Sequence, residues 1–171
     1  IVGPSCEPST ATLPPDDYDG RVEVEAFLAD AVQASGGKLS ALGIGWQVLS
    51  TPGFPTRHDR IGIGVLVRLA DGEQRGPHRL AVRLLGPDGE PRPLGRTPGG
   101  EEVRELAAPF EAGGSPASAT FALNFDGLIF TEPGTYTFVI EIDGREGKRL
   151  PFRVQQQPAS PPSEVSSGGY L

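Results

Sequence analysis

Apolar and polar residues alternate with a period of two along most of this chain, and turns rich in glycine and proline separate the alternating segments. A period of two places apolar side chains on one face of a β-strand and polar side chains on the other. Glycine and proline number 24 and 18 of the 171 residues, which argues against a helical bundle. We therefore expect an all-β protein with very little helix.

The alternation predicts about eight strands. A hairpin turn is expected at 35–38, where two glycines supply the positive φ angles that a tight turn needs. Pro151 lies within the last strand, and because proline cannot donate to a ladder, we expect that strand at a sheet edge. The stretch 101–111 fits either a short helix or a strand interrupted at Pro109, and we favour the strand. The expected strands cover 22–33, 42–48, 60–69, 79–84, 101–111, 121–126, 135–143 and 150–154.

Strands with one apolar face close most simply as two sheets packed face to face. We therefore expect a single antiparallel two-sheet sandwich, immunoglobulin-like or jelly-roll-like, over residues 21–155. The flanking segments 1–20 and 156–171 are rich in proline and serine and show no periodicity. Such a composition is typical of extended arms outside a packed core.

Charge and composition exclude several classes of function. A net charge of −7 argues against nucleic-acid binding, and no run of 18 apolar residues is present, so we expect no membrane insertion. One cysteine, Cys6, cannot form an internal disulfide or a thiolate zinc site, and the two histidines do not make a histidine-rich metal site. No catalytic motif is present. We expect no enzyme activity, no cofactor and no metal, and favour a cytoplasmic location over an exported mature form.

The closing part of the chain reads PGTYTFVIEIDG at 133–144 and FRV at 152–154. It resembles the closing hairpin of immunoglobulin-like bacterial β-sandwiches. By that resemblance Tyr136 is a tyrosine-corner residue. The hairpin occurs with many unrelated functions, so it bears on the fold alone.

A wider pattern covers residues 24–154. It consists of FLADAVQ at 27–33, GKL at 37–39, LGIGW at 42–46, PHRL at 77–80 with Leu84-Leu85, and the spacing Gly134-x-Tyr136-x-Phe138. These motifs resemble a small uncharacterised β-sandwich family of bacteria. That family has no assigned activity, so the resemblance implies no catalytic residues.

Two single residues are candidates for a site. Asp30 falls on the apolar face of the first expected strand, where a carboxylate must be paired or hydrogen-bonded. A structural role for Asp30 is favoured over a ligand site. Trp46, the only tryptophan, is in phase with Ile44 and Val48. A core anchor is favoured for Trp46 over an aromatic residue of a binding groove.

The stretch 56–60 reads TRHDR and is expected to be a loop. Arg57, His58 and Arg60 could hold an anion there, although exposed charge clusters more often remain solvated. With Asp30 and Trp46 they would form the site of a ligand-binding sandwich for a carbohydrate or a small anion.

That ligand-binding sandwich is the second hypothesis. We prefer a non-enzymatic structural or interaction module, whose terminal arms dock onto other subunits or a larger assembly. An extended arm that adds to a sheet edge is one physical route to such docking. The partners would then be proteins, either further copies of the chain or a larger assembly.

Overall fold

A computed structural model describes residues 22–69, 76–113 and 117–157, and within them the chain forms strands and no helix. The expected N-terminal arm, 1–20, lies outside the described residues, as does nearly all of the expected C-terminal arm. The last strand runs two residues further than the alternation predicts, to Gln156. The all-β expectation is confirmed.

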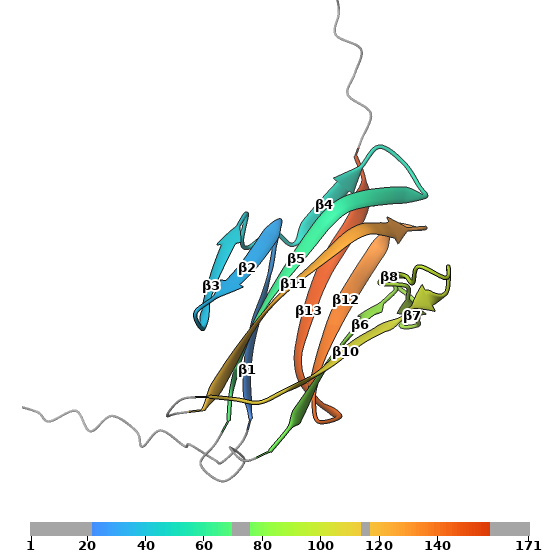
Figure 1. Ribbon diagram of the computed structural model, residues 1–171. Coiled ribbons are helices and arrows are strands. Elements are labelled where there is room, and N and C mark those ends of the chain that lie inside the picture. The colour runs from blue at the N-terminus through green and yellow to red at the C-terminus, as the bar shows by residue number, and fades with distance from the viewer. Residues whose placement is uncertain (1–21, 70–75, 114–116, 158–171) are drawn as a thin grey trace, which may run out of the picture.

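Two sheets pack against each other (Figure 1). The smaller sheet has the order β1-β5-β11, and every pairing in it is antiparallel. Its strands are β1 (Glu23–Ala29), β5 (Thr56–Arg68) and β11 (Ser118–Phe130).

The larger sheet has the order β10-β6-β12-β13-β4, with a short strand, β7, paired to β6. Its pairings are antiparallel except that β4 runs parallel to β13, which departs from the expected antiparallel sandwich. Two further hairpins, β2-β3 and β8-β9, lie outside both sheets. These strands are β2 (Ala31–Ser35), β3 (Lys38–Leu42), β4 (Val48–Thr51), β6 (His78–Leu85), β7 (Pro91–Arg92), β8 (Gly95–Arg96), β9 (Glu102–Val103), β10 (Glu105–Phe110), β12 (Gly134–Ile142) and β13 (Arg145–Gln156).

The core lies between the sheets and is formed by the alternating apolar residues. In β5 these are Ile61, Ile63, Val65 and Val67, all fully buried, as the alternation predicts. Phe152 of β13 faces them from the other sheet and is also buried. Burying a side chain of this kind stabilises the fold by roughly 1.5–3 kcal/mol.

Tyr136 forms the expected tyrosine corner. Its side chain is buried in β12, and its hydroxyl donates a hydrogen bond of 3.0 Å to the backbone oxygen of Glu132, four residues upstream. Burial, the largest influence, raises the pKa of Tyr136. The corner fixes the loop that leads from β11 into β12.

The expected strand 22–33 is broken at Asp30, so the placement of Asp30 on the buried apolar face was wrong. The chain bends there, Asp30 is exposed, and its N–H donates to the oxygen of Leu42 at 2.9 Å. The carboxylate of Asp30 lies so close to Gly43 that a Cβ at that position would come within 2.0 Å of it. Asp30 therefore begins the β2-β3 hairpin, which leaves the plane of the sheet.

The expected strand 42–48 is also absent. The chain loops from the end of β3 to the start of β4, because Gly43 and Gly45 take φ angles of +64° and +95°. Leu42, Ile44 and Val48 are exposed by 73%, 60% and 49%, instead of lying on a buried strand face.

The stretch 56–60, expected to be a loop, is the first part of β5. It is a strand because β11 continues to Phe130 and pairs with it. The buried face of β11 changes at Gly127, whose φ is +70°. Phe125 is buried before it, and Leu128 and Phe130 are buried after it, so the inward positions change from odd to even numbers.

The two strand prolines lie at edges. Pro109 is paired within β10, the outermost strand of its sheet, and does not interrupt it. Pro151 lies in β13 beyond the reach of β4, which pairs only with 153–156. The N–H of Arg153 points toward β4 and donates to the backbone oxygen of Gln47. Main-chain groups two residues apart point to the same side of a strand, so the nitrogen of Pro151 faces the open edge beyond β4.

Replacing Tyr136 with Phe tests the corner. The variant loses the hydrogen bond to Glu132 but keeps the ring packing, so we expect the free energy of unfolding to fall by about 1 kcal/mol. Urea denaturation measures this, with Thr135→Ala, an exposed position in the same strand, as the control. An unchanged midpoint for Tyr136→Phe would show that the corner contributes nothing.

Candidate functional site

The β2-β3 hairpin folds over the outer face of the smaller sheet, where Gly62 of β5 leaves room for it. A Cβ on Gly62 would lie 2.9 Å from the Val32 side chain and 3.0 Å from the Val32 nitrogen. Asn124, which pairs with Gly62 in the β5-β11 ladder, holds the hairpin in place. Its Oδ1 accepts the N–H of Val32 at 3.0 Å, and its Nδ2 donates to the Val32 oxygen at 2.8 Å. One amide side chain thus replaces a strand neighbour for Val32.

A groove of about 540 Å³ lies along this hairpin. Apolar side chains of both hairpin strands meet polar groups from the sheet beneath, so the groove could accept a chain segment with mixed character. The lining residues are Ala31, Val32, Gln33, Ser40, Ala41, Leu42, Arg60 and Asn124.

Arg57 and Arg60 lie around one carboxylate, that of Asp126. Arg60 makes a two-bond pair with Asp126, at 2.6 and 3.3 Å, and Arg57 lies over Gly127. The hydrogen bond from Arg60 is the largest influence on Asp126 and lowers its pKa, and the charge of Arg57 lowers it further. Because these groups are exposed, the pair adds little stability. His58, in the same strand segment, is half-buried.

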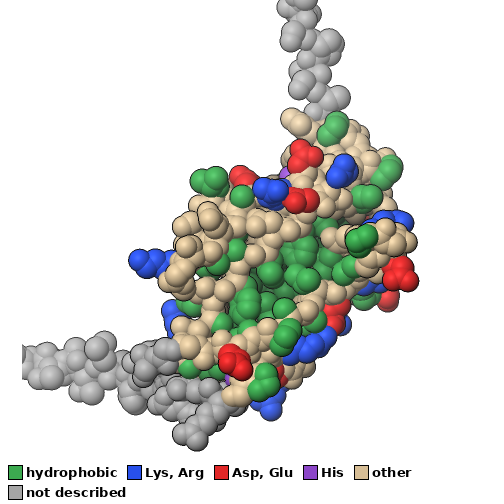
Figure 2. Space-filling view, viewed as in Figure 1, with side chains coloured by type: hydrophobic (Ala, Val, Ile, Leu, Met, Phe, Trp, Pro, Cys, Tyr) green, Lys and Arg blue, Asp and Glu red, His purple; other side chains and the backbone are tan. Residues whose placement is uncertain are grey.

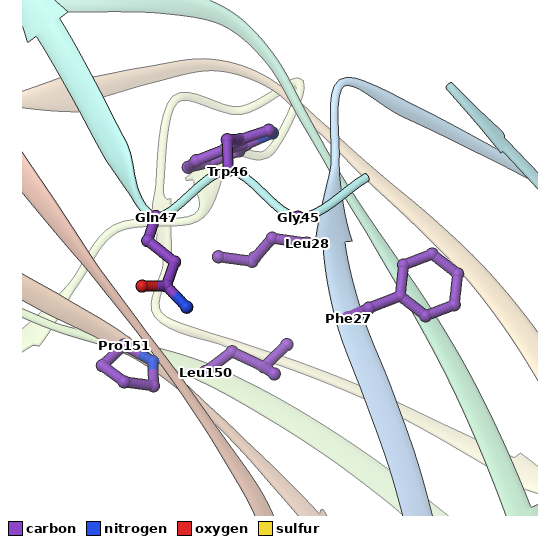
Figure 3. A pocket seen from close by; sticks show the side chains of 7 residues that line it. All are labelled: Phe27, Leu28, Gly45, Trp46, Gln47, Leu150 and Pro151. Carbon is purple, nitrogen blue, oxygen red and sulfur yellow. The ribbon is translucent and has the colours of Figure 1, made fainter. Parts of the chain in front are cut away.

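Trp46 lines a second cavity, of about 280 Å³, between β1 and β13 (Figure 3). The other lining residues are Phe27 and Leu28 from β1, Leu150 and Pro151 from β13, and Gly45 and Gln47 on either side of Trp46. The indole of Trp46 is half-buried and packs edge-on against Phe152 of the core. Its Nε1 is buried and has no hydrogen-bond partner among the described residues.

The structure does not gather the five candidate residues in one pocket. Arg60 pairs with Asp126 and Arg57 lies over Gly127 beside it. Trp46 lines a different cavity from Arg60, and Asp30 contacts the loop at Gly43. A ligand-binding role for them stays a prediction. The alternating pattern predicted neither the groove nor the role of Asn124. Both depend on the β2-β3 hairpin, which leaves the plane of its sheet.

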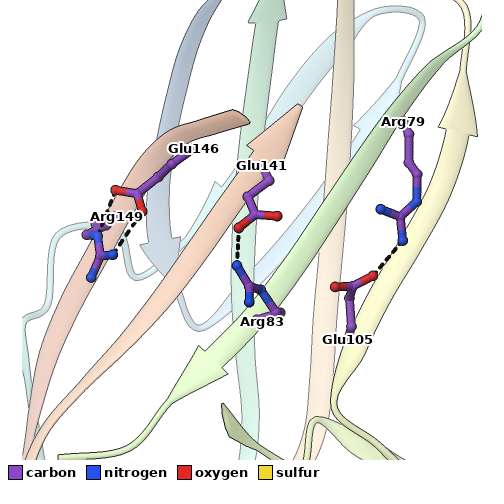
Figure 4. Close-up of polar contacts among 6 residues, drawn as sticks. All are labelled: Arg79, Arg83, Glu105, Glu141, Glu146 and Arg149. Carbon is purple, nitrogen blue, oxygen red and sulfur yellow. Dashed lines mark hydrogen bonds and ion pairs between the residues drawn. The ribbon is translucent and has the colours of Figure 1, made fainter. Parts of the chain in front are cut away.

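Ion pairs cover the outer face of the larger sheet (Figure 4). They link neighbouring strands or residues within β13. The two exposed pairs, Arg79–Glu105 and Arg149–Glu146, contribute about 1 kcal/mol or less each, whereas Arg83–Glu141 is partly buried. The pairs in Figure 4 are Arg79–Glu105, Arg83–Glu141 and Arg149–Glu146.

Among the described residues, no three of the side chains of histidine, cysteine, aspartate and glutamate are placed to hold a metal ion together. In the same part of the chain, no helix has the length and apolar character needed to cross a membrane.

Replacing Asn124 with Asp tests the clamp on Val32. The new carboxylate can still accept the N–H of Val32 but faces its carbonyl oxygen without a donor, so we expect a loss of about 1 kcal/mol in unfolding free energy at pH 7. The carbonyl oxygen raises the pKa of the new carboxyl in the folded protein above its unfolded value, and protonation restores a donor. The deficit should therefore narrow as the pH falls from 7 toward about 4 and be smallest below it.

Urea denaturation at pH 7 and at acid pH measures both effects. Asp126→Asn is the control, because it changes the charge at a neighbouring exposed position without touching the hairpin. Equal stability of Asn124→Asp and the unmodified protein at pH 7 would contradict the clamp.

Comparison with solved structures finds distant similarity only. An alkylpurine DNA glycosylase from Pseudomonas fluorescens aligns with 10% identity and a TM-score of 0.43, over 78% of this chain and 30% of its own. An immunoglobulin-like protein from Pseudomonas aeruginosa aligns with 15% identity and a TM-score of 0.40, over 80% of this chain and 98% of its own. A β-glucosidase from Listeria innocua aligns with 11% identity and a TM-score of 0.40, over 78% of this chain and 16% of its own. This chain thus spans less than a third of the glycosylase and of the glucosidase.

No curated protein matches the sequence. Among protein families, residues 25–155 match a family of unknown function, DUF6941. The match covers nearly the whole described sandwich, from β1 to β13. The chain therefore belongs to DUF6941.

Proposed function

We propose that this protein is a non-enzymatic interaction module, in which the sandwich supports terminal arms that bind other subunits or a larger assembly. The observation that carries the proposal is the exposure of three large apolar side chains, Leu42, Ile44 and Val48, within seven residues. Clustered exposed apolar side chains are typical of protein interaction sites.

The charge next to these side chains favours an acidic partner. Arg153 pairs with Val48 in the β13-β4 ladder, and both side chains are exposed. The N-terminal arm, 1–20, contains four acidic residues and no basic residue. An arm from a second copy therefore complements the neighbouring exposed side chains of Val48 and Arg153.

Docking on these side chains is favoured over pairing with the open edge of β13. Pro151 removes one outward N–H from that edge, and Lys148 adds a charge to it. Proline and lysine are the residues that natural sheets use to prevent strand addition. The arm would then be held by apolar contacts and charge.

The mass of the native particle tests this proposal. We expect the intact chain to form assemblies larger than those of the chain without 1–20, because the arm supplies the contact. Val48→Asp should reduce the assembly in the same way, since it adds a buried charge that repels the acidic arm.

Ser50→Asp is the matched control, because Ser50 is the next exposed residue of β4. Equal masses for the intact and the truncated chain would contradict the proposal. So would equal effects of the Val48 and Ser50 substitutions.

A ligand-binding role is the second candidate, and the buried Nε1 of Trp46 favours it. A donor without a partner is costly to bury, and an acceptor atom from a ligand in the adjoining cavity would compensate it. Carbohydrate hydroxyls provide such acceptors. We expect tryptophan emission to change on titration with oligosaccharides, and Gln47→Ala, at the cavity wall, to weaken the response. Unchanged emission over the titration would contradict this role.

A further inference from the structure

The outer edge of β11 carries main-chain groups that no described residue pairs. β11 pairs with β5 alone. At its start, Ser118 exchanges two hydrogen bonds with Gly113, of 2.9 and 3.2 Å, on the side away from β5. Since main-chain groups alternate along a strand, the even-numbered residues from Thr120 to Asp126 also point outward. Within residues 22–69, 76–113 and 117–157, nothing pairs with the outward main-chain donors and acceptors of Thr120, Ala122 and Asn124.

The open edges of the larger sheet along β10 and β13 are protected, and the β11 edge is not. β10 contains Pro109, and β13 contains Pro151 and Lys148, which are residues that prevent strand addition. β11 contains neither proline nor a basic residue. Its one charged side chain, Asp126, is already paired with Arg60. A second strand could therefore approach this edge without meeting an unpaired charge.

The inner face of β11 is incompletely covered. Phe121 and Leu123 point toward the core yet are only half-buried. Phe110 of β10 contacts Phe121 at a ring-centroid distance of 5.0 Å, but the rest of β10 is exposed. Figure 2 shows hydrophobic side chains gathered at the centre of this side of the molecule. A strand added beside β11 would cover them.

We propose that residues 120–126 of the β11 edge pair antiparallel with the same residues of a second copy of this chain, with Leu123 opposite Leu123. This register places Phe121 opposite Phe125 on the inner face, an aromatic cross-strand pair made twice by the two-fold symmetry.

The outer face of the same register is also compatible. Asn124, whose amide is occupied by Val32, meets the small Ala122, and Asp126 meets Thr120. No carboxylate faces another carboxylate, although each chain carries a net charge of −7. The smaller sheets of the two copies then join as one sheet of the order β1-β5-β11-β11-β5-β1.

This contact differs from the docking of the arms, and one substitution separates them. Ala122→Pro removes an outward N–H and leaves the β5 ladder intact, because the N–H of Ala122 does not point toward β5. We expect the intact chain, at about 100 µM, to be dimeric or an even-numbered assembly, and Ala122→Pro to halve its mass. Ala107→Pro, on the edge of β10, is the matched control and should leave the mass unchanged.

Tryptophan emission and the thermal unfolding curve confirm that the proline variants are folded. A monomeric intact chain at that concentration would overturn the proposal. An unchanged mass for a folded Ala122→Pro chain would overturn it as well.

A disulfide provides a test that does not depend on the proline variant folding. Opposed residues whose N–H groups point away from each other have Cα atoms about 4.5 Å apart, within the range of a disulfide. In a Cys6→Ser background, Leu123→Cys should form a cross-linked dimer on mild oxidation, and Leu106→Cys, on the β10 edge, should not. The absence of a cross-link at Leu123→Cys would overturn the proposal. The same result is expected if a terminal arm, and not a second β11, occupies the edge.

Discussion

The packing of aromatic rings around Phe152 is the interaction on which the rest of this structure depends. Its ring lies 5.6–6.0 Å from those of Phe130, Tyr136, Phe138 and Trp46. Phe130 belongs to the smaller sheet, and Tyr136 and Phe138 belong to the larger one, so the cluster joins the two sheets. Through Trp46 the cluster also anchors the loop that leads into β4. The backbone of Ile44 and Val48 is thereby held in place while their side chains stay exposed.

The sequence predicted those parts of the fold in which a strand buries one face along its whole length. The alternation around Ile63 in β5 and around Phe138 in β12 is confirmed, and the tyrosine corner at Tyr136 is confirmed by its hydrogen bond. The break at Asp30 and the change of face at Gly127 could not be predicted in this way. Both depend on tertiary contacts that a single strand does not encode.

The candidate site was harder to predict, because the informative residues act on backbone rather than on ligands. Asn124 occupies an outward position of an ordinary alternating strand, and only the hairpin lying across Gly62 gives its amide a role. Arg57 and Arg60 were recognised as candidate residues, but Asp126, with which Arg60 pairs, lies 66 residues further along the chain in another strand. Membership of DUF6941 adds the extent of the family's domain and leaves its function open to experiment.

Among the described residues, the β11 edge and several large apolar side chains are left uncovered, and the function that we propose is a module that binds other chains. Hydrogen exchange of the β11 amides at two chain concentrations tests this claim most directly. The account predicts that the outward amides of Thr120, Ala122 and Asn124 exchange quickly in dilute solution and slowly in concentrated solution, while that of Ala107 in β10 exchanges quickly in both. Equal and rapid exchange of all four amides at both concentrations would contradict it.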